Sequence, residues 1–101
     1  FVNEALNSEA PATQNFNVLA GDDYIFSAYD VFEYTFAGAG VNETLSGDTI
    51  GQRKAVSFSP TSDGVLTFTI TGDVGDKIQL ENATGRADVV TPSEYIVTDG
   101  A

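Results

Sequence analysis

The sequence predicts an all-β fold, an antiparallel β-sandwich of roughly seven to nine strands and of jelly-roll or immunoglobulin-like type. Short runs rich in Val, Phe, Tyr and Thr alternate with turn residues at intervals of about 8 to 12 residues, the spacing typical of sandwich strands. Several of these runs alternate apolar and polar side chains with period two. No run keeps a helical period of 3.6 residues over two turns.

The first 13 residues differ in composition from the rest of the chain. They combine small and polar side chains with Pro11, and only Ala5 and Leu6 form an apolar pair. Such a segment predicts a linker or an edge segment. Residues 14–101 have the length and apolar content of one sandwich domain.

The first half of the domain predicts three strands. Two of them cover residues 15–19 and 24–28, because the turn cluster Gly21-Asp22-Asp23 separates them. The next strand covers residues 31–36 and ends at a run of Ala and Gly, residues 37–40. Its alternation projects three rings from one face, those of Phe32, Tyr34 and Phe36.

A polar stretch and a hairpin follow. Residues 42–54 predict a long connection with one short strand at residues 43–45. Strands at residues 55–59 and 65–71 flank the turn Pro60-Thr61-Ser62-Asp63-Gly64, which gives the clearest hairpin in the chain. The second strand of this hairpin has an apolar face and a threonine-rich face, so one side is expected to be solvated.

The last strands are expected at residues 77–81, 87–90 and 94–98, with Pro92 in the connection between the final two. No cysteine is present, so stability must come from burial between the sheets. The expected core is Phe16, Phe26, Phe32, Phe36, Phe58, Leu66, Phe68, Ile70, Ile78 and Leu80, with Tyr34 aligned beside it.

The charge balance argues against nucleic acid and anionic membranes as partners. The chain has 15 acidic and 4 basic residues and a formal charge of -11, which repels phosphate groups. No stretch reaches the roughly 20 apolar residues that cross a bilayer.

Enzymatic activity is not expected. The chain has no His and no Cys, the groups that most often serve as base, nucleophile or metal ligand near neutral pH. With 15 carboxylates, some pair will lie at the separation used by glycosidases by chance alone. No phosphate-binding loop and no Ser-x-x-Lys motif is present.

Acidic turns predict a structural calcium ion as the one candidate cofactor. Carboxylates and backbone carbonyls are the ligands that Ca²⁺ prefers, although Asp also fills turns for conformational reasons alone. The candidate ligands are Asp22, Asp23, Asp73 and Asp76.

Tyrosine and amide side chains predict a carbohydrate site. Exposed rings stack on sugar faces while neighbouring polar groups bind hydroxyls, although Tyr is also common in half-buried core positions. Tyr29 is the best candidate ring because it adjoins Asp30 at a strand junction. The adjacent basic pair Arg53-Lys54 suits an anionic sugar such as a uronate. The candidate ligand-binding residues are Tyr29, Asn42, Gln52, Arg53, Lys54, Gln79, Asn82 and Arg86.

The segment AVSFSPTSDGVLTFTITGDVGDKIQL, residues 55–80, resembles accessory β-sandwich modules of bacterial secreted polysaccharide-degrading enzymes, including carbohydrate-binding modules. It is also similar to C-terminal domains of secreted bacterial peptidases. The resemblance implies a non-catalytic extracellular module, a monomer within a larger multimodular chain, that binds a plant cell-wall polysaccharide. The alternative is a structural or adhesive spacer of an extracellular bacterial protein or scaffold. A binding module should display clustered Tyr and amide groups, whereas a spacer should bury almost all of its rings.

Overall fold

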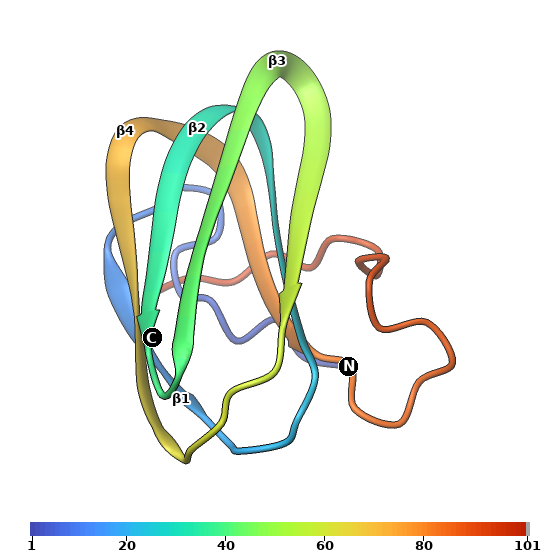
Figure 1. Cartoon of the computed structure of the whole chain (residues 1–101). Coiled ribbons are helices and arrows are strands. Elements are labelled where there is room, and N and C mark those ends of the chain that lie inside the picture. Colours follow the sequence, from blue (N-terminus) through green and yellow to red (C-terminus); the bar gives the residue numbers. More distant parts are fainter. Residues whose placement is uncertain (101) are drawn as a thin grey trace.

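The computed structural model describes residues 1–100, and these form an all-β protein with one antiparallel sheet. Its strands are β1 (Gln14–Val18), β2 (Tyr24–Gly38), β3 (Val41–Phe58) and β4 (Gly64–Asn82), in the spatial order β1-β4-β2-β3 (Figure 1). The described residues contain no helix that is long and apolar enough to cross a membrane. The predicted all-β class is therefore confirmed.

The three long strands bend in the middle, so that the sheet folds over on itself (Figure 1). Phe26 and Phe36 both lie on β2, and a straight strand would place them about 33 Å apart. Their ring centroids are 4.7 Å apart. The two halves of the sheet therefore face each other, and the core lies between them.

Left-handed backbone conformations mark the bends. Asp30 in β2 has a φ of 74°, Gly51 in β3 a φ of 80° and Gly75 in β4 a φ of 73°. The N–H of Gly51 donates to the Asp30 carboxylate at 2.6 Å, which joins two of the bends. A Cβ atom at Gly75 would lie 2.5 Å from the Tyr34 hydroxyl oxygen, so this bend has no room for a side chain.

The predicted count of seven to nine strands is not confirmed, because the described residues form four. Predicted strands at residues 24–28 and 31–36 are the two halves of β2, and those at residues 65–71 and 77–81 lie within β4. The polar stretch at residues 42–54 is part of β3 rather than a connection. A bend within a strand has the Gly- and Asp-rich composition of a turn, so the sequence predicts two strands where the structure has one bent strand.

The strands predicted at residues 87–90 and 94–98 are wrong, since neither segment is a strand. Side chains take the backbone donors that a strand ladder would use. The carboxylate of Asp88 accepts the N–H groups of Val90 and Thr91, each at 2.9 Å. Farther along, the Ile96 N–H donates to the Gln79 side-chain oxygen at 2.8 Å.

The predicted core is confirmed apart from Ile70, which is only partly buried against it. Phe68 lies at its centre, with ring centroids 5.0 Å from Phe26, 4.7 Å from Tyr34 and 5.6 Å from Phe36. Tyr34 is fully buried, as its alignment with the core phenylalanines predicted. The core also takes in residues that the sequence did not single out: Ala5, Val18, Tyr24, Ala28, Val41 and Leu45.

The first 13 residues form no strand but complete the edge of the sheet beside β4. The Glu4 N–H donates to the Leu80 carbonyl at 2.8 Å, and the Ile78 N–H donates to the Ser8 carbonyl at 3.0 Å. The side chain of Asn3 bonds both backbone groups between them, donating to the Ile78 carbonyl at 3.1 Å and accepting from the Leu80 N–H at 3.0 Å. Asn3 is buried as a result.

Candidate ligand-binding site

The site lies on the outer face of one half of the sheet, where residues 24–29, 53–58 and 76–82 pair with one another. Alternate side chains there point away from the core. Residues 83–100, which we call the C-terminal cover, lie over part of this face, so Ser27 is fully buried although its neighbours Phe26 and Ala28 face the core. The Ser57 hydroxyl donates to the Val89 carbonyl at 3.0 Å and ties the cover to β3.

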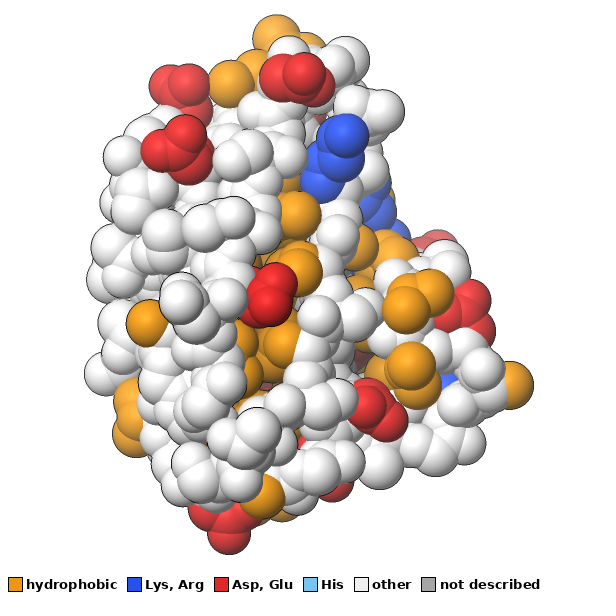
Figure 2. Space-filling model, in the orientation of Figure 1, with side chains coloured by type: hydrophobic (Ala, Val, Ile, Leu, Met, Phe, Trp, Pro, Cys, Tyr) orange, Lys and Arg blue, Asp and Glu red, His pale blue; other side chains and the backbone are white. Residues whose placement is uncertain are grey.

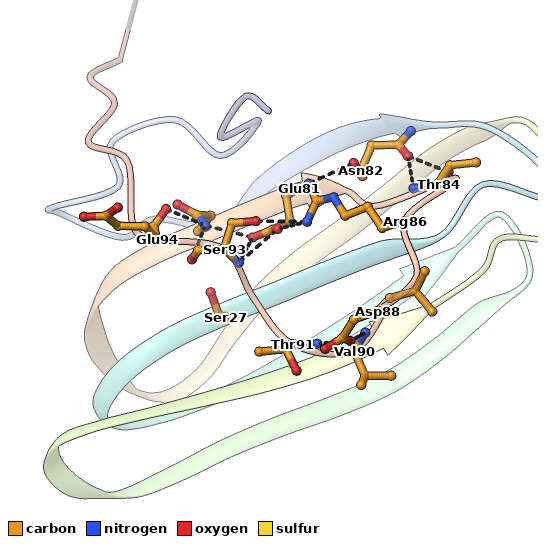
Figure 3. Close-up of polar contacts among 12 residues, drawn as sticks. Ser27, Glu81, Asn82, Thr84, Arg86, Asp88, Val90, Thr91, Ser93 and Glu94 are labelled. Atoms are coloured by element: carbon orange, nitrogen blue, oxygen red, sulfur yellow. Dashed lines mark hydrogen bonds and ion pairs between the residues drawn. The ribbon is translucent and has the colours of Figure 1, made fainter.

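A buried carboxylate holds the cover in place (Figure 3). Glu81 is fully buried and accepts from the Arg86 guanidinium at 2.6 Å and from the Ser93 N–H at 3.1 Å. The amide nitrogen of Gln79 donates to the same carboxylate at 2.8 Å. Burial alone would raise the pKa of Glu81, but these hydrogen bonds outweigh burial and lower it. Glu81 is therefore ionised, and both of its carboxylate oxygens accept hydrogen bonds from groups of the protein.

Beside the cover, two tyrosines and two cations meet at the bend of the sheet. The Arg53 guanidinium carbon lies 5.4 Å from the centroid of the Tyr29 ring, and the Lys77 ammonium nitrogen lies 5.6 Å from it. The Tyr95 ring of the cover meets Tyr29 edge-on, with centroids 6.3 Å apart and an interplanar angle of 77°. We call Tyr29, Arg53, Lys77 and Tyr95 the tyrosine–cation cluster.

The cluster is built by strand register and by one strained residue. Arg53 stands opposite Tyr29 in the β2–β3 ladder, and Asp76 stands opposite Tyr29 in the β2–β4 ladder. Lys77 follows Asp76 and has a φ of 52°. Residues other than Gly, Asn and Asp rarely adopt this left-handed conformation. Both neighbouring strands thus bring a cation to one ring.

Neither cation of the cluster forms an ion pair with a carboxylate of residues 1–100. Within residues 1–100 the one ion pair joins Arg86 to Glu81, so Arg53, Lys54 and Lys77 form none. Figure 2 shows Lys and Arg side chains gathered at the upper right of the molecule beside a band of hydrophobic side chains, with acidic side chains scattered over the rest of that face. A chain with 15 acidic and 4 basic residues therefore gathers part of its few cations in one region.

Arg53 is held by a hydrogen bond of its own. One terminal nitrogen donates to the Ser27 hydroxyl at 2.9 Å, and the Nε atom is buried without a hydrogen-bond partner among residues 1–100. Lys54 does not join it: successive strand residues point to opposite faces, and Lys54 stands opposite Ala28 of the core. The pair that is adjacent in sequence is therefore split between two sides of the sheet.

The other predicted ligand residues lie elsewhere or are already bonded. Asn42 is exposed at the start of β3, and Gln52 is exposed in the bend of the same strand. Gln79 is fully buried and bonds to the cover, including the Ser93 carbonyl at 3.2 Å. Asn82 donates to the Asp22 carboxylate at 2.9 Å, and Arg86 is held by Glu81.

Two residues of the cluster, Lys77 and Tyr95, were not among the predicted ligand residues. Lys77 follows Gly75-Asp76, which reads as an ordinary turn, and the register that carries it to Tyr29 is not visible in the sequence. Tyr95 lies in a segment predicted as a strand, and it reaches Tyr29 only because this segment crosses the sheet as an irregular cover.

The predicted calcium ligands do not form a common cluster. Asp22 accepts from Asn82, and Asp23 accepts from the Ser59 hydroxyl at 2.6 Å. Asp73 and Asp76 lie in the bend of β4. Among residues 1–100, no three carboxylates or other common ligands gather closely enough to hold a metal ion. The calcium ion stays a prediction.

A shallow cavity of about 240 Å³ lies between the N-terminal segment and β1. Its lining includes Glu4, Leu6, Gln14 and Asn17, none of which belongs to the tyrosine–cation cluster. The cavity brings together one carboxylate and several amides but no aromatic face that is open to solvent, since Phe16 is buried in the core.

Comparison with known proteins gives the cluster no precedent: the chain matches no protein-family model, no curated protein and no solved structure.

Proposed function

We propose that the protein is a non-catalytic carbohydrate-binding module that attaches a secreted, multimodular enzyme to a polysaccharide. The observation that carries the proposal is the tyrosine–cation cluster. Tyr29 and Tyr95 are both half-buried and in contact, and within residues 1–100 the Arg53 and Lys77 side chains beside them form no ion pair. Rings that stack on sugar faces next to donors for hydroxyl groups are what glycan recognition requires.

The shape of the cluster favours a single soluble chain over a flat crystalline surface. The two rings meet at 77°, so they present no continuous aromatic plane. A flexible chain can place one sugar on the Tyr29 ring and a neighbouring sugar against the edge of Tyr95. A plant cell-wall polysaccharide of this kind agrees with the resemblance of residues 55–80 to accessory modules of polysaccharide-degrading enzymes.

The second candidate is a structural or adhesive spacer, and the burial of the aromatic residues favours it. Apart from Phe1, Tyr29 and Tyr95, every ring in the chain lies in the core. The interior network around Glu81 also uses polar groups for rigidity rather than for ligands. The two candidates differ in one respect: a spacer gives the tyrosine–cation cluster no ligand.

Affinity electrophoresis and a glycan array test the proposal. Neutral β-glucans, mannans, xylans and pectins would be offered to the unaltered chain, to Tyr29→Ala and to Phe1→Ala, a matched control that removes an exposed ring outside the cluster. We expect retardation by one polysaccharide class, a loss of at least tenfold in affinity, about 1.4 kcal/mol, for Tyr29→Ala, and no change for Phe1→Ala. Retention of affinity by Tyr29→Ala removes the cluster as the site, and silence on every glycan favours the spacer.

A chelator arm tests the predicted calcium ion in the same experiment. If Ca²⁺ binds only the native protein, millimolar Ca²⁺ must raise the melting temperature and EDTA must reverse the rise. A melting temperature that is independent of both removes calcium from the proposal and leaves the tyrosine–cation cluster as its only site.

A further inference from the structure

We infer that the ligand of the tyrosine–cation cluster is a glycan with isolated carboxylate-bearing sugars, such as single uronic acid residues on an otherwise neutral chain. This inference rests on the proposed function and names the ligand class for the same site. The carboxylate would bind the Arg53 guanidinium and the Lys77 ammonium, and its sugar would pack beside Tyr29 and Tyr95.

Unpaired cations at one ring are the first argument. The chain has 15 acidic residues to neutralise 4 basic ones, yet within residues 1–100 neither Arg53 nor Lys77 forms an ion pair. Both cations instead lie against Tyr29, one from each neighbouring strand. Arg53 is fixed by the bond from one terminal nitrogen to Ser27, and since its Nε atom is buried, the other terminal nitrogen is the one left to bind a carboxylate.

The backbone of Lys77 is strained, which also indicates that its side chain has a function. Its φ of 52° is a conformation in which a lysine is strained, and Gly would adopt it freely. Strained residues of this kind gather at functional sites, where the side chain must point in one direction. Here the strain places the ammonium group 5.6 Å from the centroid of the Tyr29 ring.

The surrounding charge limits the number of carboxylates to one at a time. Burial raises the pKa of Tyr95 to about 12, and Glu9, whose carboxylate accepts from the Tyr95 hydroxyl at 2.9 Å, and Asp76 add to the rise, so two carboxylates of the protein lie near the cluster. Asp30 adjoins Tyr29, and the formal charge of the whole chain is -11. At physiological salt the screening length is about 8 Å, so carboxylates of the protein within that range of the cluster act on a ligand and would repel the further charges of a polyanion.

Isothermal titration calorimetry with three polysaccharides tests the inference. The probes are a glucuronoxylan with sparse uronic acids, the same polymer after its carboxyl groups are reduced to alcohols, and polygalacturonate. We expect the glucuronoxylan to bind at least tenfold more tightly than either of the others, and its affinity to fall as salt rises from 50 to 500 mM.

Matched variants assign the effect to the cluster. Arg53→Gln and Lys77→Gly should each reduce the preference for the glucuronoxylan over its reduced form by about tenfold. Lys54→Gln removes the same charge from the opposite side of β3 and should leave the preference unchanged. Lys77→Gly relieves backbone strain, so thermal denaturation should show that it folds at least as stably as the unaltered chain, and a loss of binding is then not a loss of fold.

Each outcome decides between two statements. Equal affinity for the glucuronoxylan and its reduced form overturns the carboxylate inference but leaves the proposed carbohydrate-binding function intact. Tighter binding of polygalacturonate overturns the limit to isolated carboxylates. Absence of binding to all three polymers, and to the neutral glycans above, overturns the inference and the proposed function together.

Discussion

The two sides of the same sheet segments are stabilised in opposite ways. On β2, Phe26 faces the core and is packed among other rings, whereas the next residue, Ser27, faces the C-terminal cover and bonds to Arg53. On β4, Leu80 faces the core between Gln79 and Glu81, whose polar side chains hold the cover. The side chains on both sides are fully buried, so burial alone does not tell the two sides apart; they are Phe26, Ser27, Gln79, Leu80 and Glu81.

The difference lies in what each interface loses when a side chain is removed. The core gains stability from apolar area withdrawn from water, and its contacts are individually weak and numerous. On the other side lie the buried polar side chains under the cover, Ser27, Gln79 and Glu81, which we call the polar layer. This layer gains little net stability from each hydrogen bond, but a missing partner leaves buried donors or acceptors unsatisfied. The core should therefore tolerate small changes in shape, whereas the polar layer should tolerate almost no change in chemistry.

The largest effect is expected from Phe68→Ala in the core. Phe68 is fully buried and contacts the rings of Phe16, Phe26, Tyr34 and Phe36. Removing a buried ring costs about 3 to 5 kcal/mol in the free energy of unfolding, which chemical denaturation measures. A change below about 1 kcal/mol would show that this position is not part of the core.

Glu81→Ala should have the next largest effect, about 2 to 3 kcal/mol. The variant leaves the Arg86 guanidinium, the Ser93 N–H and the Gln79 amide without their common acceptor. We expect the value to lie below that of Phe68→Ala because the Arg86 side chain is 29% exposed and water replaces part of the loss. Glu43→Ala, at an exposed position on β3, is the matched control and should change stability by less than about 0.5 kcal/mol.

Hydrogen exchange distinguishes the two interfaces more sharply than the total stability does. In Glu81→Ala, amides of the cover, such as those of Ser93 and Ile96, should lose protection while amides in the middle of β2 keep theirs. Equal loss throughout the chain would mean that the cover and the core unfold as one unit rather than separately.

The sequence predicted most residues of the core, but it did not predict that the polar layer is buried. Alternation such as Phe32, Tyr34 and Phe36 assigns side chains to one face with no knowledge of the partner strand, because the period is local. Gln79 and Glu81 alternate with Leu80 in the same way, and a solvent-facing position was the natural reading. They are buried only because the irregular cover lies across them. The sequence contains no periodic signal for a segment of that kind.

The tyrosine–cation cluster was predicted only in part, because the sequence shows the alternation within a strand but not the register between strands. Tyr29 stood out through its place at a strand junction and Arg53 through its rare positive charge, and both lie in the cluster. Lys54 was grouped with Arg53 by adjacency, although neighbouring strand residues point to opposite faces. Lys77 required the register of β4 against β2, which shifts more than once along the pair.

Acid should weaken the polar layer selectively. Hydrogen bonds lower the pKa of Glu81 in the folded protein below the usual value near 4.5, in spite of burial. A lowered folded-state pKa contributes stability that is complete above the unfolded-state pKa and is lost as the pH falls through the folded-state value. The stability advantage of the unaltered chain over Glu81→Gln should therefore shrink between about pH 5 and pH 3. A constant difference over this range would show that folding does not lower the pKa of Glu81, and a difference that grows toward acid would show that the fold raises it.

The smallest effect is expected at the bend of β4. Lys77→Gly relieves a left-handed lysine whose φ is 52°, and we expect a gain of about 0.5 to 1 kcal/mol after the greater unfolded-chain entropy of Gly is subtracted. Gly75→Ala is the opposite change in the same bend and should destabilise, because its Cβ would meet Tyr34 and Phe32. If Lys77→Gly destabilises instead, then the contact of the ammonium group with Tyr29 outweighs the backbone strain, and Lys77 stabilises the fold rather than being held strained for a ligand.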